Sequence, residues 1–428
     1  MVKQNLFERG NKVNQNQSFR LLWISQSIAN LGDSFYILAI VTFIYNRTGS
    51  AAFAGLFPIL RVCAQAISGL AAPLLMDRLR LGTLLWMAEM GQTICFGSMC
   101  ILYFFLPSQW LIPAILLLVF AISMLHGWAI PVRNALVPRL VPSHLLVKAN
   151  SLLATSDQIV LLVGWSLSGI LVAEWGVIRV LEITAIMMFF STLALLFVKD
   201  PSANVSAQPE SQKRWDRMKE GWITIWGNPI LRTLSYMEII SGLGESIWAG
   251  SIILVFVKEV LHKGEDWWGF INASNFAGTI LGGLLIWKLS KKIENRMLFT
   301  MLISSFSIGV LTIAFTYSSN PWFALGVALI MGPPYQARSI AQRTLLQFHT
   351  PEVLLPKVFA AFGTILFVTF GFSVLLMGWM ADQWGIRFVY MSTAGLYVLS
   401  AFLTLMMMKK ASRSIQTQKE ERYMNKIE

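Results

Sequence analysis

The sequence predicts an all-α polytopic membrane protein with twelve transmembrane helices in two halves of six. Composition is the first reason, because 55% of the 428 residues are hydrophobic, only 13% are charged and the mean hydropathy is +0.60. Soluble domains carry about 25% charged residues, so a soluble fold is excluded. The second reason is a repeat: Leu-Gly-Asp-Ser at 31–34 returns as Leu-Gly-Glu-Ser at 243–246, each inside a long apolar segment. A carboxylate at the same position of the motif in both segments predicts that the two halves of the chain are duplicates.

Twelve apolar segments each supply the ~20 residues that a helix needs to cross the hydrocarbon core. They lie at residues 19–46, 51–76, 81–106, 110–132, 151–174, 177–198, 229–257, 266–288, 296–317, 321–343, 356–382 and 384–408. The expected parts of the chain are a polar N-terminal segment at 1–18, a first half at 19–198, a linker at 199–228, a second half at 229–408 and a charged tail at 409–428.

Most of the 34 Lys and Arg residues fall on the side of these segments that holds both termini and the linker. The positive-inside rule places that side in the cytoplasm, so we expect a multi-pass protein of the cytoplasmic membrane with both termini inside. The net charge of +12 is therefore interpreted as a topology signal and not as a nucleic-acid surface. Membrane lipids with anionic headgroups are the expected partners of the basic loops.

The linker contains apolar side chains at helical spacing, namely Trp215, Met218, Trp222 and Ile225, with basic residues between them. This pattern predicts a helix that lies on the inner membrane surface. The alternative is a solvated connector in which the aromatic residues have no special role.

A short motif after the second apolar segment introduces a family resemblance. Asp77 and Arg78 match the Asp-Arg pair of the loop Gly-x-x-x-Asp-Arg-x-Gly-Arg-Arg, although Pro73, Arg80 and Leu81 depart from its other positions. That loop is a signature of the major facilitator superfamily, which this part of the chain resembles. The resemblance implies a gate in which Asp77 caps the helix that starts near residue 356, where a carboxylate is stabilised by the helix dipole.

The stretch at 131–141, Pro-Val-Arg-Asn-Ala-Leu-Val-Pro-Arg-Leu-Val, is followed by Ala-Asn at 149–150. This spacing resembles the drug-efflux branch of the superfamily, which includes macrolide and enterobactin exporters. Glu-Gly at 220–221 and Asn-Pro at 228–229 fit the same branch. The resemblance covers nearly the whole chain, and it implies the major facilitator fold with two parallel six-helix repeats.

The antiporter motif of the superfamily, Gly-Pro-x-x-Gly-Gly, is matched only in part. Gly164 and Gly169 agree with it, whereas Trp165 and Ser168 do not. Small residues here would let helices pack closely. Ser123 stands where many drug antiporters have an arginine. Proton antiport is therefore not established by these motifs.

Asp33, Arg61 and Glu245 are the leading candidates for a proton-coupling or substrate site. Counting along the predicted helices at 1.5 Å per residue places them about 21, 22 and 24 Å from the inner end of their spans. Charged groups at this depth are costly and mark functional sites. We expect Asp33 to pair with Arg61, either as part of the coupling machinery or as a static structural pair.

Glu245 has no cation at its depth in the sequence, and the resemblance implies that its span lines the central cavity. Burial without a partner disfavours the charged carboxylate, which suits a proton carrier and also suits a site for a cationic substrate. The alternative is a carboxyl hydrogen-bonded to neighbouring helices.

Weaker candidates are Glu238, which lies on the same span, and a His126–Asp157 pair about 9 Å from the inner face. Such a pair would titrate near neutral pH, although a lone histidine in a span more often makes a packing hydrogen bond. Glu89 and Glu182 fall on spans that the resemblance assigns to the scaffold, and we expect them to be structural.

These observations predict a secondary active transporter that exports small amphipathic molecules, drug-like or macrolide-like, by alternating access and proton antiport. The alternatives are a siderophore or peptide exporter, an uncoupled uniporter or channel, and a receptor that has lost transport. The sequence contains no nucleotide-binding motif, catalytic constellation or metal-ligand spacing. We therefore expect no enzyme activity, no cofactor and no metal. The expected partners of a monomer are protons, a small-molecule substrate and lipids.

Overall fold

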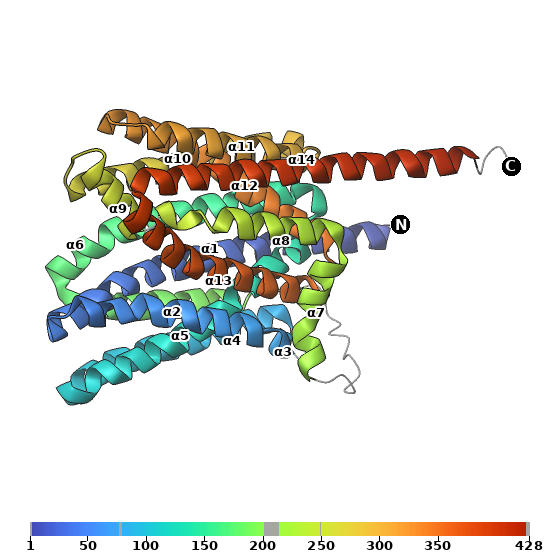
Figure 1. Cartoon of the computed structure of the whole chain (residues 1–428). Coiled ribbons are helices and arrows are strands. Elements are labelled where there is room, and N and C mark those ends of the chain that lie inside the picture. The colour runs from blue at the N-terminus through green and yellow to red at the C-terminus, as the bar shows by residue number, and fades with distance from the viewer. Residues whose placement is uncertain (1, 77–78, 201–213, 249, 425–428) are drawn as a thin grey trace. The chain divides into compact units, whose positions relative to one another are not determined.

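The structure is a computed structural model that describes residues 2–76, 79–200, 214–248 and 250–424 (Figure 1). It divides into two compact units. Unit 1 comprises Met1–Thr224 and Thr350–Phe367, and unit 2 comprises Ile225–His349 and Val368–Glu428. Each unit is a helical bundle, so the predicted fold class is confirmed by the all-helical architecture of the described residues.

The helices of unit 1 are joined by short connections from α1 to α6. They are α1 (Val2–Thr48), α2 (Ala51–Ala71), α3 (Pro73–Met76), α4 (Leu81–Phe105), α5 (Ser108–Leu140), the 3-10 turn η1 (Ser143–Leu145), α6 (Leu146–Leu195) and most of α7 (Arg214–Gly227). Helix α1 packs against α2 and α6, while α4 packs against α5 and α6. Tyr36 lies at the centre of the core, with its ring edge-on to Phe57 and Phe96 at centroid distances of 5.4 and 5.0 Å.

Unit 2 repeats this arrangement with one interruption. Its helices are α8 (Pro229–Gly242), the 3-10 turn η2 (Glu245–Trp248), α9 (Gly250–Glu259), α10 (Glu265–Glu294), α11 (Met297–Thr316), α12 (Pro321–His349), α13 (Leu355–Trp384) from Val368 onward, and α14 (Ile386–Met424). Helices α10 and α12 pack together, as do α11 and α14 (Figure 1). In the core the ring of Phe315 stacks on the rings of Phe256 and Tyr390.

All twelve predicted spans fall on helices. Eight helical segments of the described chain are long and apolar enough to cross a membrane. One of them, Ser143–Leu195, contains two predicted spans, which are separated at Gly176, where φ is +78°. The remaining spans lie on α2, on α8 with α9, and on α12. Gly385 makes the same kind of left-handed break between α13 and α14, with φ of +81°, because glycine adopts this conformation without strain.

The span predicted at 229–257 is not one continuous helix. Helix α8 ends at Gly242, η2 follows, and α9 starts at Gly250. A side chain at Gly244 would place its Cβ 2.5 Å from Cγ2 of Thr393 on α14, so the backbone passes close to that helix only because the residue is glycine. The break therefore puts Glu245 at the start of a 3-10 turn.

The terminal segments predicted at 1–18 and 409–428 are helical over their described residues. Helix α1 already begins at Val2, and α14 runs on to Met424 (Figure 1). Both extensions lack proline and are rich in Lys, Arg, Gln and Glu, which are good helix formers. The helices therefore continue past the apolar stretch.

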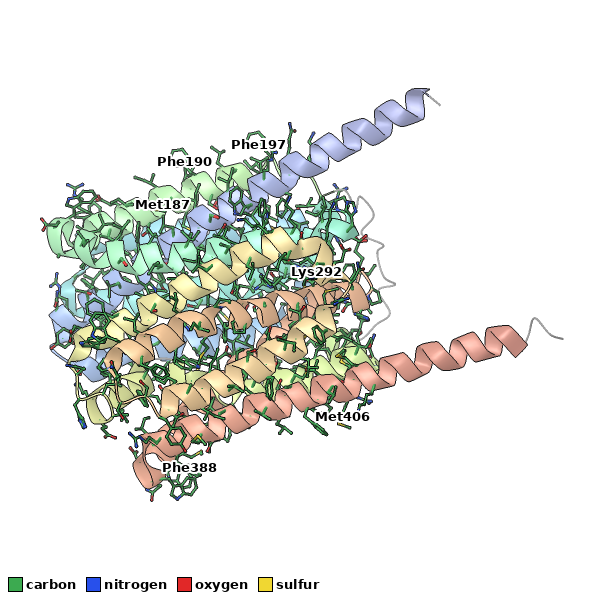
Figure 2. All side chains as sticks on the ribbon, turned by 90° about the horizontal axis from the view of Figure 1, so that it is seen from above. Met187, Phe190, Phe197, Lys292, Phe388 and Met406 are labelled. Carbon is green, nitrogen blue, oxygen red and sulfur yellow. The ribbon has the colours of Figure 1, made fainter. Side chains whose placement is uncertain are left out.

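Many large apolar side chains point outward from the helices. Phe190 and Phe197 of unit 1 are 56% and 64% exposed, and Phe388 and Met406 of α14 are 46% and 54% exposed (Figure 2). Soluble proteins rarely expose apolar surface on this scale. The exposed apolar faces are those of a protein whose solvent is lipid.

Candidate functional site

A bidentate ion pair joins the first two helices of unit 1. Arg61 Nη1 on α2 lies 2.9 Å from Asp33 Oδ1 on α1, and Arg61 Nη2 lies 2.5 Å from Asp33 Oδ2. The two side chains are 16% and 11% exposed. The structure thus brings together the two residues that were placed at one depth, and it neutralises both charges within the bundle.

Local sequence explains how α1 and α2 meet. The chain reverses at Gly49, whose φ is +65°, and the Ser50 hydroxyl accepts a hydrogen bond from the amide of Phe53 to cap α2. Gly164 on α6 is also needed near the ion pair, because a Cβ at this position would lie 2.5 Å from the Cβ of Ser34. Gly169 is exposed, and an added Cβ would make only an ordinary contact of 3.8 Å with Leu38.

A second ion pair lies in the same unit. Arg133 on α5 reaches Asp157 on α6, with distances of 3.3 Å from Nη1 to Oδ1 and 3.1 Å from Nη2 to Oδ2. Asn30, one turn before Asp33 on α1, also donates to Asp157 Oδ1 at 2.8 Å. Among the described residues, no hydrogen bond or ion pair joins Asp157 to His126. The structure thus pairs Asp157 with Arg133 and not with His126.

Glu245 of unit 2 has a neutral partner. The phenolic hydroxyl of Tyr335 on α12 donates to its carboxylate. Among the described residues, no ion pair joins Glu245 to a cation. The sequence left Glu245 without a partner, and Tyr335 was missed because it lies on a helix far away along the chain.

A cluster of polar side chains from the same face of α12 also surrounds Glu238 of α8. Gln342 donates to Glu238 Oε2 at 2.8 Å, and Arg338 Nη2 lies 3.9 Å from the same oxygen. Arg338 also donates to the Ser241 hydroxyl at 2.5 Å. Tyr335, Arg338 and Gln342 follow helical spacing, so one face of α12 serves both carboxylates of the broken span.

Two polar atoms of this cluster have no hydrogen-bond partner within the described chain, although both are buried. They are Nε of Arg338 and the hydroxyl of Tyr397 on α14. The guanidinium of Arg338 lies over the ring of Tyr397 at 5.9 Å, an attractive cation–π geometry. Buried polar groups normally have a partner, so this corner of unit 2 can accept a polar group of a ligand. No described group of three or more His, Cys, Asp or Glu side chains could hold a metal ion.

The predicted gate residues Asp77 and Arg78 lie outside the described residues. Two ion-pair systems of unit 1 lie at the start of α13. Glu220 on α7 accepts a hydrogen bond from the ammonium group of Lys357, which is 1% exposed. Arg139 at the end of α5 reaches Glu352 at 3.1 Å and Asp200 at 3.3 Å. Helix α7 therefore binds directly to the first turn of α13.

Comparison with known proteins identifies the family. The family model of the Major Facilitator Superfamily matches the chain at residues 22–332 and again at 234–425. The MFS-type transporter YfmI of Bacillus subtilis is 34% identical over 91% of this chain and 97% of its own length. Macrolide efflux protein A of Streptococcus pyogenes is 22% identical over 90% and 94% of the two chains, so the resemblance to macrolide exporters is confirmed.

Solved structures agree on the fold. An outward-facing bacterial homologue of the iron transporter ferroportin superposes with a TM-score of 0.74 at 13% identity, over 91% of this chain and 98% of that one. The Escherichia coli fucose:proton symporter FucP gives the same TM-score at 12% identity, over 91% and 98%. The chain is therefore a multi-pass membrane protein and belongs to the major facilitator superfamily of transporters.

Proposed function

We propose that the protein is a secondary active exporter of small amphipathic molecules, drug-like or macrolide-like, which works by alternating access and proton antiport. Similarity over nearly the full length to macrolide efflux protein A, and to Multidrug resistance protein MdtG of Dickeya zeae at 25% identity over 71% of the chain, supports export. The positive-inside pattern supports a cytoplasmic-membrane location with both termini inside. A monomer with anionic lipids at its basic loops completes the proposal.

The hydrogen bond between Glu245 and Tyr335 is the observation that carries the coupling proposal. A proton carrier alternates between a neutral and a charged form, and its protonation must not leave a buried counter-ion without its partner. Protonation of Glu245 breaks no ion pair among the described residues, because its hydrogen-bond partner is the neutral phenol of Tyr335. Protonation of Asp33 instead leaves the Arg61 guanidinium buried without its counter-ion, and breaking such a pair costs about 3–5 kcal/mol. We therefore assign the carried proton to Glu245.

In this proposal the Asp33–Arg61 pair has a different role. The ion pair holds α1 and α2 together in one state of the transport cycle and is broken in the other. Glu238 stays with Arg338 and Gln342 and holds α8 against α12. Arg338 Nε and the Tyr397 hydroxyl are the polar contacts available to a substrate beside Glu245. An amphipathic molecule with one polar group and a large apolar body fits such a site.

The membrane potential supplies enough free energy to drive export against a substrate gradient. One charge that crosses the membrane potential yields about 2.3 kcal/mol per 100 mV, which supports about a fiftyfold gradient of a neutral substrate. The test uses proteoliposomes with a radiolabelled macrolide and an imposed pH gradient. We expect substrate-dependent proton movement in the direction opposite to the substrate. Downhill flux that does not depend on protons would overturn antiport and favour a uniporter or channel. If the protein transports a siderophore or a peptide but no macrolide, the other class of exporter is favoured.

A further inference from the structure

Glu89 on α4 is a buried carboxyl group that the proposed transport cycle does not use. It is 2% exposed, and both of its oxygens have protein partners. Gln26 on α1 donates its Nε2 hydrogen to Oε1. Oε2 lies 2.6 Å from the hydroxyl oxygen of Ser191 on α6. Glu89 therefore lies where three helices of unit 1 meet.

The surroundings of Glu89 are polar but uncharged. No cation of the described residues lies within ion-pair distance, and Arg133 on α5 is the charged side chain that acts on Glu89 from farther away. Ser25 and Ser191 are both 0% exposed, and Gln26 is 6% exposed. An ionised carboxylate without a counter-ion is very costly in such a place.

The number of hydrogens available for the hydrogen bonds of Ser191 indicates whether the Glu89 carboxyl is protonated. The Ser191 hydroxyl oxygen lies 2.8 Å from the carbonyl oxygen of Ser25 as well as 2.6 Å from Glu89 Oε2. Each of these oxygen–oxygen separations is that of a full hydrogen bond, and a serine hydroxyl supplies only one hydrogen. The Ser25 carbonyl is an acceptor only, so the second hydrogen must come from Glu89.

A similar serine in unit 2 shows the alternative solution. Ser373 lies 2.5 Å from the carbonyl oxygen of Leu243 and 2.7 Å from the hydroxyl of Ser246. There the Ser246 hydroxyl is itself able to supply the second hydrogen, so no acid is needed. Ser191 has no such hydroxyl on its second side, because its partner is the Glu89 carboxyl.

We propose that Glu89 is a permanently protonated carboxylic acid whose O–H donates to Ser191, which in turn donates to the Ser25 carbonyl. The acid accepts from Gln26 with its other oxygen, so it joins α4 to α1 and α6 through one neutral chain of hydrogen bonds. Its proton is structural and is not the proton that is transported.

Infrared difference spectroscopy of the purified full-length protein in lipid tests the assignment directly, because the carbonyl band of a carboxylic acid is separate from carboxylate bands. We expect Glu89→Gln to remove one carboxylic-acid band at neutral pH, while the exposed control Glu259→Gln removes none. Loss of a carboxylate band in Glu89→Gln would overturn the proposal, and so would an unchanged acid region.

Ser191→Ala provides a second measurement in a protein that retains Glu89. The acid band should stay but move, because the acid loses its acceptor; a carboxylate would give no acid band to move, which would refute the assignment. Glutamine keeps one acceptor and one donor, so Glu89→Gln should retain the melting temperature and transport, whereas Glu89→Leu should lower the melting temperature. Loss of proton-driven transport in a stable Glu89→Gln protein would show that the proton is not merely structural.

Discussion

The phenolic hydroxyl of Tyr335 donates to the carboxylate of Glu245, whereas the equivalent carboxylate of the first half, Asp33, is held by the guanidinium of Arg61. The repeat thus preserves the acid in both halves and changes the charge of its partner. A neutral partner permits the acid to lose its charge, and a cationic partner opposes this. The asymmetry is the physical reason to look for the proton carrier in unit 2.

Replacement of Glu245 by glutamine should abolish export driven by a pH gradient. Glutamine retains the hydrogen bond to Tyr335 but cannot exchange a proton, so substrate binding and downhill exchange should remain. Uptake of a labelled substrate into inverted vesicles, with and without the gradient, measures both activities. Glu259→Gln, an exposed carboxyl at the end of α9, is the control. Uphill export at the wild-type rate would move the carrier role to Asp33 or to Glu238.

Removal of the Tyr335 hydroxyl should shift the pH dependence of transport and leave its stoichiometry intact. Tyr335→Phe deletes the hydrogen bond that stabilises the charged form of Glu245, so protonation becomes easier and the activity profile moves to higher pH. Transport rates across a pH series measure this shift. A profile that moves to lower pH, or does not move, would contradict the role given to the phenol.

The Asp33–Arg61 pair should show strong coupling in a double-mutant cycle. Asp33→Asn alone leaves a buried guanidinium without its counter-ion, which we expect to destabilise the protein by about 3–5 kcal/mol. Asp33→Asn combined with Arg61→Gln should recover most of that loss, because no charge then remains. Thermal unfolding in detergent measures stability, and transport is measured separately. Equal stability of the single and double variants would exclude a strong pair.

Several of these features were predictable from the sequence for simple reasons. A window of apolar residues long enough to cross the membrane defines a span wherever it lies, and every predicted span falls on helical residues. Depth follows from the fixed rise of a helix, which is why Asp33 and Arg61 were placed at one level. Their pairing needed only that level and the short turn between consecutive helices at Gly49.

Other features depend on which direction a side chain points around its helix, and depth does not give that direction. Asp157 and His126 share a level, yet Asp157 faces Arg133 and Asn30. Tyr335 and Arg338 reach α8 and η2 from α12, a contact that no local pattern encodes. The break before Glu245 was also missed, because glycines are tolerated within membrane helices; here the approach of Gly244 to Thr393 makes the difference.

Labelling should show both termini and the linker on the cytoplasmic side. Cysteines introduced at Ser206 and Gln416 should react with an impermeant reagent only from the cytoplasm, and one at Lys263 only from outside, because basic loops stay inside. The native Cys63, Cys95 and Cys100 are free and must first be replaced. Opposite labelling would reverse the orientation.

The contact between Glu220 and Lys357 should act as part of the inner gate. Lys357 is 1% exposed, and it lies at the start of α13, the helix that passes from unit 1 into unit 2 at Val368. Glu220→Gln weakens a charge-assisted hydrogen bond worth about 1.5–3 kcal/mol. If the contact forms only in the outward-open state, the inward-open population should rise about tenfold or more. Spin-label distances across the cytoplasmic side of the two halves measure that population.

The control for the gate is Asp216→Asn, which removes an exposed carboxylate from the same helix α7 and should leave the distances unchanged. Asp77→Asn tests the motif residue, and combining it with Glu220→Gln reports whether the two act on one helix end. If both act on the start of α13, their effects should be non-additive. Distances that stay as in the wild type in both single variants would show that this end of α13 does not control the inner gate.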